Sequence, residues 1–173
     1  MQEKFLCVMA GYDAETETRL AGLQNILYES GFCGRHTKNI PQHITLGSFP
    51  LSAEERLTAL LKDLAGKEHA FPVTFNHLGI FGGAQVLFVA PDTSHELLDL
   101  KENFGDSFNW TPHTTMLIDD SEQIFAAQKL LTEKFSAFAG TVESLHLYEF
   151  WPTRHILTVG LKKQIDASLG GSK

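Results

Sequence analysis

The sequence predicts an α+β fold with two antiparallel sheets around a central cleft and helices on the outer faces. An internal repeat is the first observation: residues 39–90 match residues 109–160 when shifted by 70 positions without a gap. Segments with helical spacing of apolar residues also alternate with β-rich runs, and short turns join two pairs of these runs into hairpins. We therefore expect one bilobal domain over residues 1–173, with its halves packed about a pseudo-two-fold axis.

The chain begins with a predicted strand and helix that precede the repeat. Residues 5–10 form an apolar run with β character, and Asp13 is a suitable N-cap for the helix that follows. The repeat then opens with a predicted strand over residues 43–49. Because side chains alternate along a strand, His43 and Thr45 share one face, which we expect to line a cleft.

A helix and a hairpin complete the first half. Ser52 and Glu55 have the spacing of a capping box at the start of a leucine-striped helix. Residues 71–80 and 85–89 are β-rich runs joined by a glycine-containing turn, which predicts antiparallel pairing.

The second half repeats this order. Thr93 and Glu96 form another capping-box pattern, residues 113–118 predict a second strand that starts with histidine, and Asp120 is a further helix cap. The last two β-rich runs are residues 141–150 and 156–162.

Composition restricts the classes of partner. The formal net charge of −7 argues against a protein that binds long nucleic acids through a broad basic face. Two cysteines, Cys7 and Cys33, do not make a disulfide framework. Residues 1–10 have neither the layout of a signal peptide nor the length of a membrane span. We therefore expect a cytoplasmic protein that does not contact a membrane. A monomer is a separate expectation, which the composition does not test.

The two histidine strands carry the predicted chemistry. His43 with Thr45, and His113 with Thr115, each place one imidazole and one hydroxyl on the same strand face. Imidazoles titrate near neutral pH, and hydroxyls can donate to phosphoryl oxygens. If the two pairs face each other across a cleft, they provide a general base, a general acid and two phosphate ligands without a metal.

These motifs resemble those of a known family. Ile-Pro-Gln-His43-Ile-Thr45-Leu and Phe-Asn-Trp-Thr-Pro-His113-Thr-Thr115-Met are similar to the paired signatures of the two-histidine (2H) phosphoesterases. This superfamily includes the 2′-5′ RNA ligases, also called RNA 2′,3′-cyclic phosphodiesterases. The resemblance spans nearly the whole chain in motif order, spacing and element order, and it implies a bilobal α+β body around a water-filled cleft.

The resemblance also implies an activity. His43 and His113 would be acid and base, Thr45 and Thr115 would hold the phosphate, and no metal or other cofactor would take part. The substrate would be a short RNA end, a 2′-5′ oligonucleotide or a small cyclic nucleotide, and the reverse ligation is an open alternative. A second alternative is a non-catalytic module that binds nucleotides or RNA ends. Many members have an arginine shortly after the second motif, whereas Met116 follows it here.

Other residues remain open as substrate contacts. Arg35, His36 and Lys38 precede the first motif, and Arg154 and His155 lie in the last hairpin; solvated loops are the simpler interpretation for both groups. A base could stack on the aromatic residues Phe49, Phe81, Trp110, Tyr148 or Trp151. His95 and Glu96 begin like a zinc-protease helix, but Asp99 stands where the second histidine would be, so the zinc interpretation fails.

Overall fold

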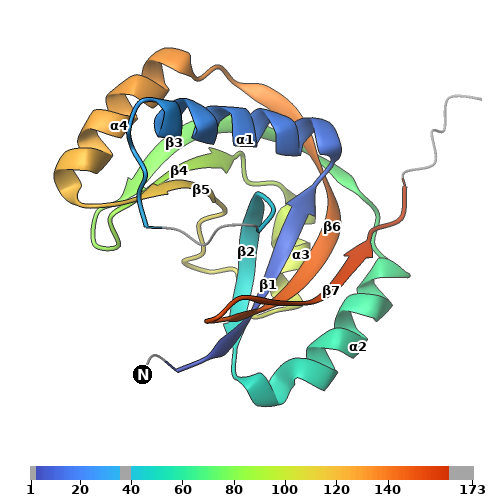
Figure 1. Cartoon of the computed structure of the whole chain (residues 1–173). Coiled ribbons are helices and arrows are strands. Elements are labelled where there is room, and N and C mark those ends of the chain that lie inside the picture. Colours follow the sequence, from blue (N-terminus) through green and yellow to red (C-terminus); the bar gives the residue numbers. More distant parts are fainter. Residues whose placement is uncertain (1–2, 36–39, 164–173) are drawn as a thin grey trace, which may run out of the picture.

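The structure is a computed structural model that describes residues 3–35 and 40–163. Its elements are β1 (Phe5–Tyr12), α1 (Ala14–Glu29), β2 (His43–Phe49), the 3-10 turn η1 (Leu51–Ala53), α2 (Glu54–Ala65), β3 (Phe71–Phe81), β4 (Val86–Pro91), α3 (His95–Glu102), β5 (Thr114–Ile118), α4 (Ser121–Lys134), β6 (Phe138–Phe150) and β7 (Arg154–Gly160). Helices α1 and α4 pack against each other, and α2 packs on β6 and β7 at the other end of the molecule (Figure 1). Across the described ranges, no helix combines the length and apolar content of a membrane span.

The strands confirm the predicted antiparallel α+β class, but they form one connected sheet instead of two. The main path is β2-β1-β6-β3-β4-β5, and β7 pairs with β6 beside it. The 13-residue β6 is long enough to pair with two strands along one of its edges. Its start pairs with β3, and its remainder pairs with β7. We call β2-β1-β6-β7 the first branch and β3-β4-β5 the second branch.

The branches do not coincide with the sequence repeats. Each repeat has the order strand, helix, strand, strand: β2, α2, β3 and β4 in the first, and β5, α4, β6 and β7 in the second. However, β2 reaches the β6–β7 pair of the second repeat through β1, whereas β5 pairs with β4 of the first repeat. Each histidine motif is therefore held in a branch whose hairpin comes from the other repeat.

Two of the predicted helix starts are confirmed. The Asp13 carboxylate accepts a hydrogen bond from the Thr16 N–H at 2.7 Å, and Asp120 accepts one from the Gln123 N–H at 3.0 Å. The leucine stripes of the first two helices point into the core. Buried leucines on α1 and α2 are Leu20, Leu23, Leu27, Leu57, Leu61 and Leu64.

The two predicted capping boxes are wrong. Ser52 and Glu55 do not form one, because the 3-10 turn Leu51–Ala53 precedes α2 and its final alanine takes the N-cap position. The predicted cap at Thr93 is displaced by one residue: the Ser94 hydroxyl accepts the first side-chain hydrogen bond of α3. Both errors concern the residue that caps the N-terminus of the helix, and both predicted helices are present.

Candidate active site

Strand β2 presents the first motif to one face of the sheet. Ile44 and Leu46 are fully buried in the main core, whereas His43 and Thr45 are half-buried on the opposite face. On β1, the residue across from His43 is Gly11 and the residue across from Thr45 is Met9. The alternation predicted from the sequence is thus confirmed for this strand.

Strand β5 presents the second motif. Thr114 and Met116 are buried and Thr115 is half-buried across from Phe88, while His113 lies immediately before the strand. The buried Thr114 hydroxyl shares a 2.6 Å hydrogen bond with the Tyr12 hydroxyl of β1, which anchors β5 to the other branch. The His113 ring packs edge-on against Phe81, with 4.7 Å between ring centroids.

Both catalytic candidates make the same local hydrogen bond. The Nδ1 atom of His43 lies 2.8 Å from the Pro41 carbonyl oxygen, and the Nδ1 atom of His113 lies 2.9 Å from the Thr111 carbonyl oxygen. A carbonyl oxygen can only accept, so each Nδ1 carries the proton in these bonds. In a neutral ring the Nε2 atom is then the acceptor, which is the state that a general base requires.

Burial shifts the titration of both imidazoles in the same direction. It lowers the pKa of His43 below its ordinary value of 6.5, and the positive charge of His113 lowers that pKa further, while the bond to Pro41 opposes both effects. Burial likewise lowers the pKa of His113. Both rings therefore favour the neutral form near pH 7.

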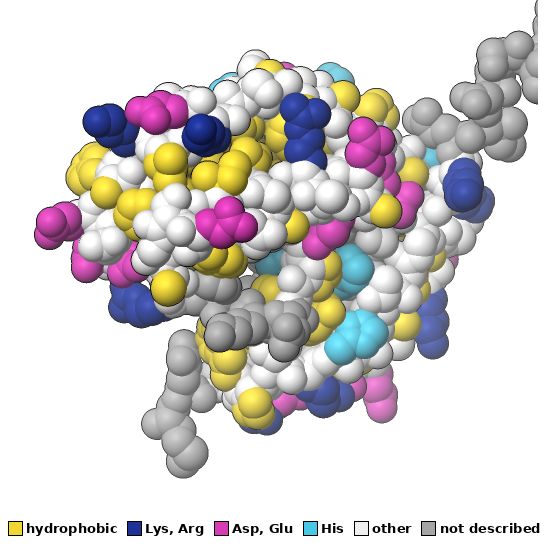
Figure 2. All heavy atoms as spheres, turned by 45° about the horizontal axis from the view of Figure 1, so that its top comes forward, with side chains coloured by type: hydrophobic (Ala, Val, Ile, Leu, Met, Phe, Trp, Pro, Cys, Tyr) yellow, Lys and Arg dark blue, Asp and Glu magenta, His cyan; other side chains and the backbone are white. Residues whose placement is uncertain are grey.

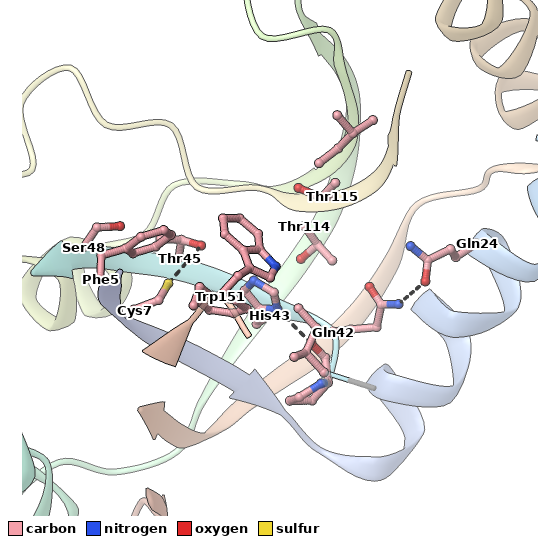
Figure 3. A pocket seen from close by; sticks show the side chains of 14 residues that line it. Phe5, Cys7, Gln24, Gln42, His43, Thr45, Ser48, Thr114, Thr115 and Trp151 are labelled. Atoms are coloured by element: carbon pink, nitrogen blue, oxygen red, sulfur yellow. Dashed lines mark hydrogen bonds between the residues drawn. The ribbon is translucent and has the colours of Figure 1, made fainter. Parts of the chain in front are cut away.

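A cavity of about 330 Å³ lies between the motif strands. His43 and Thr45 enter it from β2, and Thr114 and Thr115 enter it from β5 (Figure 3). The other lining residues are Phe5, Cys7, Gln24, Ile40, Pro41, Gln42, Ser48, Ile118, Phe150 and Trp151. His113 is not among the lining residues, so the structure brings three of the four predicted site residues to this cavity.

A third histidine occupies the same face of the first branch. His146 on β6 is 8% exposed and lies across from Met9. Its ring nitrogens share hydrogen bonds with the Ser144 hydroxyl at 3.1 Å and the Thr158 hydroxyl at 2.9 Å. Burial lowers its pKa to about 4, with smaller contributions from the charges of His43 and His155. Histidine side chains also gather near the middle of the face drawn in Figure 2.

The remaining predicted contacts have varied outcomes. Arg35 is exposed, and its backbone N–H donates to the Ile118 carbonyl of β5 at 2.7 Å; His36 and Lys38 lie outside the described residues. Arg154 forms 2.6 Å ion pairs with Glu54 and Glu149, which gives it a structural role.

The remaining candidates for substrate contact are His155, in the last hairpin, and the five aromatic residues. His155 is exposed, and its Nε2 atom lies 2.9 Å from the Thr158 hydroxyl. Of the five aromatic candidates, Trp151 lines the cavity. Among the described residues, no group of three or more histidine, cysteine or acidic side chains is arranged to hold a metal ion.

Sequence reasoning missed several lining residues. Gln42 directly precedes His43 and could have been suspected from that position alone. Gln24 and Phe5 gave no such signal, because they reach the cavity only through the packing of α1 and β1 on the motif strands.

Comparison with known proteins identifies the family of the chain. Residues 13–150 match the family model of the 2′-5′ RNA ligase superfamily. The chain belongs to this superfamily. The match covers both histidine motifs and confirms the resemblance to the two-histidine phosphoesterases. No curated protein matches the chain in sequence.

Solved structures show the same fold at low identity. TT0787 of Thermus thermophilus is 15% identical, with a TM-score of 0.62 over 93% of this chain and 100% of the other. E. coli LigT complexed with 3′-AMP is 19% identical, with a TM-score of 0.61 over 93% and 99% of the two chains. A structure described as a phosphoesterase is 16% identical, with a TM-score of 0.56 over 92% and 99%. The 2′-5′ RNA ligase fold is thus present over almost the whole chain.

Proposed function

We propose that the protein is a metal-independent phosphodiesterase acting on a phosphodiester in which a ribose 2′-oxygen takes part. The main support is the matched pair of Nδ1–carbonyl bonds at His43 and His113, which leaves both Nε2 atoms for proton transfer. Thr45 and Thr115 reach the cavity from opposite strands and can donate to one phosphoryl group between them.

The reaction needs one neutral imidazole and one imidazolium. With a 2′,3′-cyclic phosphate, water adds to phosphorus while the neutral ring takes a proton from the water. The bond from phosphorus to one ribose oxygen breaks, and the imidazolium gives that oxygen its proton. Each ring then holds the protonation state of the other, so the roles of His43 and His113 exchange in the reverse direction, in which the ribose oxygen attacks phosphorus and water leaves.

The cavity favours a small substrate. Its aromatic members Phe5, Phe150 and Trp151 can contact a nucleoside, and the net charge of −7 disfavours binding of a long RNA. LigT, which has the same fold, has been crystallised with 3′-AMP, ATP and NADP+. We therefore expect a short RNA end, a 2′-5′-linked dinucleotide or a small cyclic nucleotide as substrate.

Turnover by purified protein in the presence of a chelator tests this proposal. A 2′,3′-cyclic nucleotide and a 2′-5′-linked dinucleotide are the substrates, and His43→Ala and His113→Ala are the variants. We expect each variant to lose about 10²-fold or more in kcat, since each proton transfer is needed separately. His69→Ala, an exposed histidine outside the site, should keep the wild-type rate.

Two results would overturn the proposal. Wild-type rates in both site variants would remove the acid and base roles. Binding of nucleotide products by the wild type without turnover of either substrate would instead identify a non-catalytic binding module.

A further inference from the structure

The two motif strands are the two ends of the sheet path. Strand β2 pairs only with β1, and β5 pairs only with β4, among the strands described. Within the described part of the chain, no main-chain ladder joins β2 to β5, although the cavity lies between them. The backbone hydrogen bonds of the sheet therefore do not fix the distance from His43 and Thr45 to Thr115 directly.

One side chain from α1 bridges the two edges. The Gln24 amide donates from Nε2 to the Met116 carbonyl oxygen of β5 at 3.2 Å. Its Oε1 accepts a hydrogen bond from the Gln42 Nε2 at 2.8 Å, next to His43 (Figure 3). The Gln42 backbone N–H donates to the Glu17 carboxylate, also on α1, at 2.8 Å. The residue before the first motif and the residue after the second are thus linked through one glutamine.

A second side chain bridges the edges in the opposite sense. The Trp110 indole N–H, from the segment that leads to His113, donates to the Thr45 carbonyl oxygen of β2 at 3.1 Å. A buried ammonium holds this segment, since Lys101 Nζ donates to the carbonyl oxygens of Gly105 at 3.1 Å and Asp106 at 3.0 Å. Lys101 Nζ also lies 5.9 Å from the Trp110 ring centroid.

Both bridges end on a backbone carbonyl oxygen of a motif strand. Thr45 is the last residue of the first motif and Met116 directly follows the second, and each carbonyl oxygen accepts from a side chain that does not belong to the neighbouring strand. An edge strand leaves such groups without ladder partners, so they are available to set the position of the strand. The Gln24 bond runs from α1 to β5, and the Trp110 bond runs from the segment before β5 to β2.

We propose that Gln24 and Trp110 are positioning residues that set the spacing of the two histidine motifs. The inference rests on the proposed function, because the spacing matters only if both motifs act on one phosphate. Neither residue needs to touch the reacting atoms. A displacement near 1 Å at a catalytic group can cost on the order of 10²-fold in rate, so small changes at these bridges are measurable.

Gln24→Met tests the first bridge with little change in volume, and Trp110→Phe tests the second with a smaller aromatic ring. Each removes the donor, and the second keeps an aromatic side chain at position 110. Gln128→Met, on α4 away from the cavity, is the matched control. We expect each bridge variant to lose about 10-fold in kcat on a 2′,3′-cyclic nucleotide with a smaller change in KM, and the control to behave as wild type.

Two measurements without substrate separate this inference from the proposed function. Binding of inorganic phosphate should weaken about 10-fold in both variants, since Thr45 and Thr115 would no longer reach the same anion. In histidine NMR titrations, the mutual influence of His43 and His113 should weaken, whereas a residue that only stabilises the fold would leave it unchanged. Both measurements remain informative even if the wild type turns over no substrate.

Wild-type phosphate affinity and wild-type titration in both folded variants would overturn the inference, even if their melting temperatures fall. If Gln24→Met does not fold, Gln24→Asn replaces it: the amide is kept, but the shorter side chain cannot reach Gln42 and Met116 together. Wild-type phosphate affinity in Gln24→Asn would likewise count against the bridge.

Discussion

Replacement of the buried His146 by glutamine should reduce the decrease in the free energy of unfolding that occurs as the pH falls from 7 to 4. Glutamine can still hydrogen-bond to the Ser144 and Thr158 hydroxyls, but it does not titrate. His146→Gln therefore removes a proton-binding group while keeping polar contacts in this part of the first branch.

The size of the effect follows from the pKa of His146, which burial lowers from 6.5 to about 4. In the unfolded chain the ring binds a proton below about pH 6.5, whereas in the native protein it stays neutral until about pH 4. The contribution of the neutral His146 to folding stability is therefore fully present above pH 6.5, and it is lost as the pH falls toward 4. At about 1.36 kcal/mol per pKa unit, the loss attributable to this one group is about 3 kcal/mol.

Urea unfolding at half-unit steps from pH 7 to pH 4 measures this loss. Other groups titrate in the same range, so the informative quantity is the difference between the wild-type and His146→Gln curves. We expect this difference to change by about 3 kcal/mol across the range, in favour of the variant at low pH. The exposed His69→Gln serves as the control and should follow the wild type.

Parallel curves for the wild type and His146→Gln would refute the reasoning. They would mean that His146 takes up its proton at the same pH in the folded and unfolded protein, and that burial between its two hydroxyl partners does not penalise its charge.

The remaining predictions concern Gly11 and the pH dependence of turnover. An added Cβ at Gly11 would enter the space of the His146 ring and the Ser144 hydroxyl, so Gly11→Ala should lower the free energy of unfolding by about 1–3 kcal/mol in urea titrations. Gly160→Ala has no atom near the new methyl group and should change it little. Because burial lowers the pKa of both His43 and His113, kcat/KM should peak below about pH 6.5 and fall toward pH 8 as the general acid loses its proton. An optimum above about pH 7.5 would contradict the two-imidazole assignment.

The periodic features of the sequence predicted the fold class well. Ile44 and Leu46 alternate with His43 and Thr45 because only one face of β2 is buried, and that pattern is visible in the sequence alone. The Asp13 cap could also be predicted from the sequence, since an N-cap depends on residues within one turn.

The failures in sheet topology and in the cavity lining have a common physical cause, which is dependence on distant partners. Whether β6 ends one sheet or joins two depends on its pairing with β1, β3 and β7, and no local pattern encodes that choice. Gln24 and His146 have ordinary sequence neighbours, and their roles arise from contacts with residues elsewhere along the chain. Ser52 failed for a local reason, because the preceding turn adopted 3-10 geometry.

The crossing of strands between repeats has a consequence for dividing the protein. A break between β4 and α3 would leave β1–β2 and β3–β4 as two separate strand pairs, because β6 is the strand that links them. The other piece would hold β6–β7 and a β5 without its neighbour β4. Two-stranded hairpins are marginally stable in water, so neither fragment is a self-sufficient folding unit, and activity from split halves would require their reassembly.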